Sequence, residues 1–239
     1  MSSKQLNLAM LTKVIGILNK TDGRDKLGKA IQNLCKYLNW YYSTNNKDLA
    51  DRMIGLSNGM RDARKLFRLF KSMNEIEKLI QLSQTDSPDV VKKALDVLAR
   101  AFFAGYWFFD NLVILITVKF LKSNKEKATQ TSNTFWFFGI LFTQIQALYQ
   151  INQNMQSLVQ LKIEASKGNG QGEEIQKKIE NLKQNNITQF LKIVQCTGDI
   201  LAAGTGSKIF ERLVGKTPNS GTIGLGGLVS ALIAGYQMF

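Results

Sequence analysis

Proline is scarce in this chain: Pro88 and Pro218 are the only two among 239 residues. A proline inside a helix removes one backbone hydrogen bond, and its ring clashes with the preceding turn, so this scarcity permits long helices over most of the length. Between the polar breaks, apolar residues recur every three or four positions, which is the spacing of a helix with one apolar face. The sequence therefore predicts an all-α fold.

The predicted helices fall into two regions. Residues 1–90 are expected to form amphipathic helices on a membrane surface, the first over 3–19 and the second over 23–43. Residues 91–239 are expected to form membrane-associated helices, of which the last is rich in glycine. The fold class expected is thus that of a helical membrane protein.

A single long helix is predicted over residues 49–80, with an apolar face and a basic face on opposite sides. At about 100° per residue, its basic side chains fall within roughly a third of a turn. Such a helix can lie on an anionic bilayer, with apolar side chains inserted and cations among the headgroups. The same pattern also fits a solvated face of a soluble bundle. The predicted headgroup contacts are Arg61, Arg64, Lys65, Arg68 and Lys71, and the predicted inserted residues are Met53, Leu56, Met60, Ala63, Phe67 and Phe70.

Residues 101–118 form an apolar run that is just long enough to span a membrane. Asp110 interrupts it, and a carboxylate in hydrocarbon is costly. Either the segment lies at the interface or Asp110 faces a partner helix, and a buried core helix is a further alternative. Residues 134–149 are also apolar, but they are too short and contain too many glutamines to predict a second span.

The end of the chain, residues 223–239, is uncharged, apolar and rich in glycine. Its small residues repeat every fourth position, at Gly227, Ala231 and Gly235. This pattern lets membrane helices pack closely, so we expect the segment to anchor the chain and to pair it with another copy. The alternative is a terminal helix within a soluble core.

Charge and residue usage narrow the possible functions. A formal net charge of +13 implies an anionic partner, which is either nucleic acid or a lipid surface. The apolar C-terminus and the aromatic segment 102–109 fit nucleic acid poorly, so an anionic bilayer is the partner expected. The chain has no histidine, and its two cysteines cannot complete a tetrahedral thiolate site. We expect no catalytic, cofactor-binding or metal-binding residues.

Four segments, in order, resemble the peroxisomal membrane elongation factors, the peroxin eleven family. GRDKLGKAIQNLCKYLNWY at 23–41 resembles the opening helix of the family, and LSNGMRDARKLFRLFKSM at 56–73 resembles its amphipathic helix. AFFAGYWFFDNLVIL at 101–115 carries a tyrosine, aspartate and asparagine motif, and GLGGLVSALIAGYQMF at 224–239 matches a glycine-rich ending. Residues 122–186 show little resemblance to the family. A tryptophan that is usual near the C-terminus of family members is missing from this chain.

The resemblance implies a protein of the peroxisomal membrane that elongates the organelle before division. The amphipathic helix would insert into one leaflet and favour curvature, and copies would self-associate into a homo-oligomer. They would recruit a dynamin-like GTPase and its membrane adaptor. Two alternatives stay open from the residues alone. One is a pore or transporter for small solutes, using polar groups such as Asp110, Asn111 and Gln144, and the other is a soluble helical scaffold.

Overall fold

The computed structural model describes residues 3–166 and 172–239, and this part of the chain is helical, without strands. The all-α prediction is confirmed. The helices are α1 (Ser3–Leu18), α2 (Thr21–Tyr42), α3 (Lys47–Leu66), α4 (Lys71–Gln84), α5 (Val90–Thr117), α6 (Lys125–Ser166), α7 (Gly172–Gly206), α8 (Ile209–Val214) and α9 (Ser220–Tyr236).

Short polar side chains begin four of these helices. Asn46, Asp89, Asn124 and Asn219 each accept a hydrogen bond from the backbone N–H three residues ahead, at 2.8–3.0 Å. Such caps satisfy donors that the first helical turn leaves without a partner. Both prolines lie in breaks, since Pro88 precedes α5 and Pro218 precedes α9.

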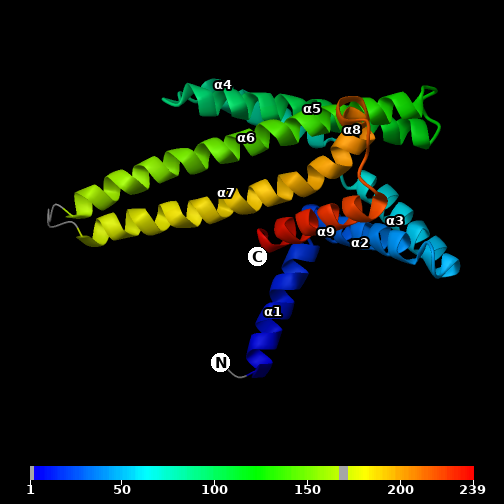
Figure 1. Cartoon of the computed structure of the whole chain (residues 1–239), viewed down its shortest axis with the longest axis horizontal. Helices are drawn as coiled ribbons and strands as arrows, with labels where there is room; N and C mark the ends of the chain where they lie inside the picture. The colour runs from blue at the N-terminus through cyan, green and yellow to red at the C-terminus, as the bar shows by residue number, and fades with distance from the viewer. Residues whose placement is uncertain (1–2, 167–171) are drawn as a thin grey trace.

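The helices form a chain of neighbours whose order differs from the sequence. α4 packs on α5, α5 on α6, α6 on α7, α7 on α9, α9 on α2, and α2 on α3, which returns to touch α5 (Figure 1). The last helix therefore lies between the second and the seventh. α1 contacts α2 and projects away from the other helices, and the far ends of α6 and α7 also extend beyond them (Figure 1).

The apolar core is thin and rich in aromatic rings. Ile140, Cys196 and Ala203 form one buried cluster between α6 and α7, with Phe103 and Trp136 against it. Further along α5 and α6, the ring of Phe102 contacts those of Phe135, Phe138 and Phe142, with centroids 5.4–5.8 Å apart. Ring pairs at these separations pack favourably beyond their buried area alone.

Among the described residues, α5 is the one helix that is long and apolar enough to cross a membrane, while α9 is apolar but shorter. The predicted apolar run 101–118 falls within α5 apart from its last residue, and the predicted C-terminal segment falls largely within α9. Large apolar side chains are exposed on all the helices of the described chain, and such surfaces suit contact with a membrane or with another protein.

The single helix predicted over 49–80 is wrong. α3 ends at Leu66, and α4 begins at Lys71 after a turn in which Phe70 adopts a left-handed conformation with φ 62°. This conformation costs a residue with a side chain about 1–2 kcal/mol. No glycine or proline lies between residues 60 and 87, so the local sequence gives no reason for the break.

Candidate membrane-contact surface

The break between α3 and α4 is held by a buried carboxylate. Asp25 of α2 is only 2% exposed, and its Oδ1 accepts hydrogen bonds from Nε of Arg64 at 3.0 Å and Nε of Arg68 at 2.9 Å. Arg68 also donates to the hydroxyl of Tyr106 on α5 at 3.2 Å. A buried carboxylate is costly unless it is paired, so Asp25 draws both arginines inward.

One acidic residue, Asp22, and one aromatic residue, Trp107, also contact the side chains of this turn. The ammonium of Lys71 pairs with Asp22, one turn before Asp25 on α2. The guanidinium of Arg68 and the ammonium of Lys71 lie 5.6 and 5.5 Å from the ring centroid of Trp107. Contacts with α2 and α5 therefore offset the backbone strain at Phe70.

The structure thus separates the five predicted headgroup contacts. Arg61 is exposed, Lys65 and Lys71 are partly exposed, and Arg64 and Arg68 point into the protein. Burial alone would lower the pKa of Arg68, but Tyr106 and Asp25 outweigh it and raise that pKa above its usual value. Burial lowers the pKa of Lys65, although Asp110 and Asp62 oppose the shift. A direct contact between any of the five and lipid stays a prediction.

The predicted inserted residues do not share one exposed stripe either. Leu56, Ala63 and Phe70 are exposed, and Phe70 is 69% exposed, whereas Met53, Met60 and Phe67 are half-buried. Their insertion also stays a prediction.

A different set of exposed apolar side chains lies on α4 and on Leu69, which is two residues before the start of α4. We call it the α4 stripe, and it consists of Leu69, Met73, Ile76 and Ile80. The spacing of three and four residues places Met73, Ile76 and Ile80 on one face of α4, and Leu69 precedes that helix. Its neighbouring face, which includes the buried Glu75, packs on α5, where Glu75 pairs with Arg100 at 3.1 Å. Sequence analysis missed this stripe because it assumed the face of a continuous helix.

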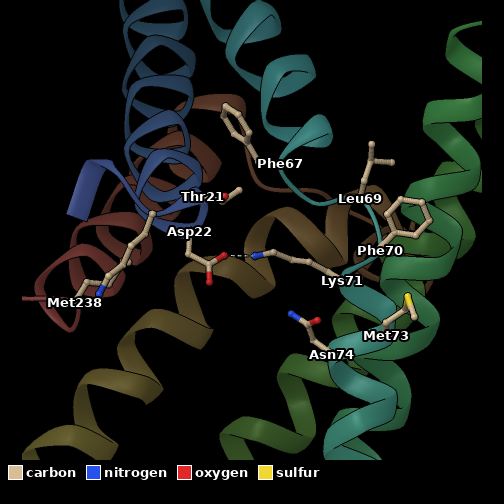
Figure 2. A pocket seen from close by; sticks show the side chains of 10 residues that line it. Thr21, Asp22, Phe67, Leu69, Phe70, Lys71, Met73, Asn74 and Met238 are labelled. Carbon is tan, nitrogen blue, oxygen red and sulfur yellow. Dashed lines mark hydrogen bonds and ion pairs between the residues drawn. The ribbon is translucent and has the colours of Figure 1, made fainter. Parts of the chain in front are cut away.

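An open hollow of about 570 Å³ lies beside the turn. Figure 2 shows Lys71 reaching across it to Asp22, with Met238 from the end of α9 on the far side. Leu69, Phe70 and Met73 gather on the α4 side of the hollow (Figure 2). Lys20 also lines it. The hollow therefore combines apolar walls with two cations.

A second buried ion pair joins three helices, and sequence analysis missed it. Lys29 of α2 donates to both carboxylate oxygens of Asp199 on α7, at 2.7 and 2.9 Å, and to the hydroxyl of Ser230 on α9 at 2.7 Å. The one available signal was Asp199, the single acidic residue within the apolar pattern of 187–203. Its partner is distant in sequence and could not be identified from spacing.

The small residues of α9 pack within the chain. A Cβ at Gly227 would lie 2.2 Å from the side-chain oxygen of Asn33, and Ala231 is buried. Gly235 has no neighbour within 4 Å of such a Cβ among the described residues. The close packing predicted for this pattern thus occurs between α9 and α2, and self-association through it stays a prediction.

On α5, Asp110 is buried, and its motif neighbour Asn111 is half-buried. One side-chain oxygen of each, Oδ2 and Oδ1 respectively, is buried without a hydrogen-bond partner in the part of the chain that the structure describes. Buried oxygens normally have partners, so these two are unusual.

Comparison with known proteins gives one consistent result. The family model of Peroxisomal biogenesis factor 11 (PEX11) matches residues 11–239. The chain is 28% identical to the Peroxisomal membrane protein 11 homolog of Dictyostelium discoideum, over 96% of this chain and 94% of that protein. It is 26% identical to Peroxisomal membrane protein 11B of Arabidopsis thaliana, over 97% and 98%. It is 24% identical to Peroxisomal membrane protein 11A of Rattus norvegicus, over 91% and 92%. No solved structure matches it.

Proposed function

Because this chain belongs to the Peroxisomal biogenesis factor 11 family and is a protein of the peroxisomal membrane, we propose that it elongates that membrane before division by inserting the α4 stripe into one leaflet. The family membership itself supports a role in peroxisome proliferation. A soluble scaffold does not fit a protein of this membrane.

The exposed α4 stripe is the observation that carries this proposal. Met73 is 63% exposed, and Ile76 and Ile80 are each about half exposed, so the stripe has apolar area free for a bilayer. Burial of such partly exposed side chains stabilises by about 1 kcal/mol each. The hollow beside the turn has Lys20 and the ion pair of Lys71 with Asp22 next to apolar walls, which suits the boundary between headgroups and acyl chains.

The length of α4 supports a one-sided effect. Its 14 residues span about 21 Å, which is less than the ~30 Å hydrocarbon core of a bilayer. A helix this short cannot cross the membrane, so insertion of its stripe expands one leaflet and not the other. Unequal expansion bends the bilayer, which is the step needed for elongation.

The test uses the full chain reconstituted with neutral and anionic vesicles, imaged by electron microscopy. We expect tubules on anionic vesicles and their loss in Ile76→Glu, which places a charge in the stripe. Gln81→Glu adds the same charge to the polar side of α4, away from the hollow, and should leave tubulation intact. Equal tubulation by Ile76→Glu and the unchanged chain would contradict insertion of the stripe.

Recruitment of fission machinery is a further part of the proposal, and the family resemblance supports it. Copies gathered on an elongated membrane would bind a dynamin-like GTPase and its membrane adaptor. Flotation of the purified GTPase with vesicles that carry the full chain should exceed flotation with protein-free vesicles. Equal flotation in the two samples would remove this part of the proposal.

A pore for small solutes is the second candidate, and the partnerless oxygens of Asp110 and Asn111 favour it. Ionisable groups inside membrane helices often line solute pathways. We expect solute flux through reconstituted protein to fall at least severalfold in Asp110→Asn, which keeps the shape and removes the charge. Flux no greater than that of empty vesicles would eliminate this candidate.

A further inference from the structure

The turn that follows α5 is strongly basic. Residues 118–127 carry four lysines and one acid, and all four lysines are exposed. The acid, Glu126, pairs with Lys208 at 3.6 Å, so the four lysines have no acidic partner within the part of the chain that the structure describes. These lysines are Lys119, Lys122, Lys125 and Lys127. Unpaired cations this close together favour an anionic partner.

The pair between Lys208 and Glu126 also brings α8 to this end of α6. The side-chain amide of Gln130 on α6 donates to the carbonyl oxygen of Ser207 at 3.3 Å, so the chain is held on both sides of Lys208. Residues 208–216 add three exposed basic residues and one exposed acid, and these are Lys208, Arg212, Lys216 and Glu211. We call residues 118–127 and 208–216 together the basic edge.

Large apolar side chains lie among the cations of the basic edge. Phe120 is 76% exposed, Leu213 is 79% exposed and Val214 is 70% exposed. In water, single exposed apolar residues are ordinary, but several that lie together mark an interaction surface. Apolar side chains that alternate with lysine and arginine are typical of segments at the boundary between headgroups and acyl chains.

The position of the basic edge suits this boundary. α5 has 28 residues and is about 42 Å long, which exceeds the ~30 Å hydrocarbon core of a bilayer. Both ends of a crossing α5 therefore reach headgroups. The basic edge begins directly after the last residue of α5, whereas α4 packs along the first half of that helix, where Glu75 pairs with Arg100.

Net charge differs between the two ends of α5. Residues 85–100, at its start, contain three acids and three basic residues. The basic edge contains seven basic residues and two acids. The strongest attraction to an anionic surface is thus confined to the end of α5, with each cation contributing roughly 1 kcal/mol near such a surface.

We propose that the basic edge binds the headgroup of an inositol lipid that carries additional phosphates, with Phe120, Leu213 and Val214 inserted among the neighbouring acyl chains. Lysine and arginine donate charge-assisted hydrogen bonds to phosphate oxygens. Clusters of four to eight such residues beside a membrane helix are typical of sites for multiply charged headgroups. One such headgroup neutralises several lysines while only one lipid molecule is ordered.

An acidic protein segment would satisfy the cations equally well. It would leave the apolar side chains of the basic edge at the level of the membrane without a partner. Their exposure at the end of a crossing helix therefore favours lipid.

The first test is photo-cross-linking of the full chain in phosphatidylcholine vesicles. The probe is phosphatidylinositol bisphosphate with a photoactivatable acyl chain, present as a trace component. We expect unlabelled phosphatidylinositol bisphosphate in excess to reduce labelling of the protein about fivefold. The same amount of charge added as phosphatidylserine should reduce it less than twofold.

A matched pair of variants tests the cations. Lys119→Gln combined with Lys122→Gln removes two charges from the basic edge, and labelling should fall about fivefold. Lys177→Gln combined with Lys183→Gln removes two exposed charges from α7 and should leave labelling within twofold. Helix content and unfolding temperature of both variants should match those of the parent, because all four positions are exposed.

The second test concerns the apolar side chains. Phe120→Cys and Val159→Cys, the latter on the far half of α6, each receive a fluorescent label, and Cys35 and Cys196 are buried. Lipids brominated near the headgroup end of their acyl chains should quench the label at Phe120→Cys. They should leave the label at Val159→Cys unquenched.

Three outcomes would overturn the proposal. Equal competition by the two lipids, or full labelling of the Lys119 and Lys122 variant, would mean that the cations form no site for this headgroup. An unquenched label at Phe120→Cys would mean that the edge faces water, where an acidic protein is the better partner. The inference does not depend on insertion of the α4 stripe, so Ile76→Glu should lose tubulation and keep normal labelling.

Discussion

Asp25 accepts hydrogen bonds from two guanidinium groups, and this decides which way the basic residues of α3 and of the turn after it face. Helical spacing alone places Arg64 and Arg68 on the same side as Arg61. A carboxylate buried in α2 cannot remain unpaired, so two of the three turn toward it. The orientation of these side chains is thus set by a residue on another helix and not by the spacing within their own.

The pair between Lys29 and Asp199 gives a prediction at the same scale. Lys29→Met leaves a buried carboxylate without its cation, and removal of one partner of such a pair costs about 3–5 kcal/mol of unfolding free energy. Lys29→Met combined with Asp199→Leu removes both charges and should recover most of that loss. Chemical unfolding of detergent-solubilised protein measures both variants. If the double variant were as unstable as the single one, packing and not charge would explain the site.

Among the elements, the turn between α3 and α4 departs most from the local sequence. The side chains that create it, on α2 and α5, lie about 40 residues before and after it, and no spacing rule connects them. The other helices mostly follow their own pattern. α2, α5 and α9 each contain a continuous apolar or amphipathic run, so their positions could be predicted within a few residues.

The left-handed residue of this turn gives a prediction at the element scale. Glycine adopts positive φ without strain, so Phe70→Gly should be more stable than Phe70→Ala by about 1 kcal/mol. Both variants remove the same exposed ring, so the comparison isolates the backbone. Denaturant midpoints of the two variants measure the difference. An alanine variant as stable as the glycine variant would mean that the turn is absent from the protein in solution.

The contact between α7 and α9 gives a second prediction at this scale. A Cβ at Gly198 would lie 2.2 Å from the carbonyl oxygen of Gly226, where the two backbones meet. Gly198→Ala should therefore lower the unfolding free energy by about 1–3 kcal/mol, as overpacking does. Gly235→Ala is the matched control, because nothing described lies within 4 Å of its Cβ. Thermal unfolding of both variants measures the effect, and equal stability would contradict this packing.

At the scale of the whole molecule, the sequence predicts that the protein belongs to a membrane, but it does not predict which helices pack against one another. The charge of +13 and the apolar runs favour a membrane, and the relatives confirm that location, whereas the anionic character of the bilayer stays a prediction. The placement of α9 between α2 and α7 depends on close contacts at Gly198, Gly224 and Gly227. A glycine shows that a close approach is possible, but it does not identify the partner. The residues predicted to insert all precede α4, so the α4 stripe was not among them, and their contact with lipid stays a prediction.

The depth of each part in the bilayer gives a prediction for the whole molecule. Phe108 on α5 and Gln156 on the far half of α6 are both exposed, but we expect them to meet lipid and water respectively. In reconstituted vesicles opened to reagent on both sides, a charged maleimide should label Gln156→Cys at least tenfold faster than Phe108→Cys. Detergent-unfolded samples of both, labelled at equal rates, are the control. Equal rates in intact vesicles would contradict α5 as the membrane-spanning helix.

The bond from Lys29 to Ser230 joins residues 201 positions apart, and this has a consequence for how the protein is made. The second helix leaves the ribosome long before the helices that neutralise its lysine exist. Until α7 and α9 emerge, Lys29 must stay in water or on a chaperone, because an unpaired charge is not stable in an apolar interior. We therefore expect the chain to complete its fold after translation, arriving at its membrane as a finished polypeptide and not being inserted one helix at a time.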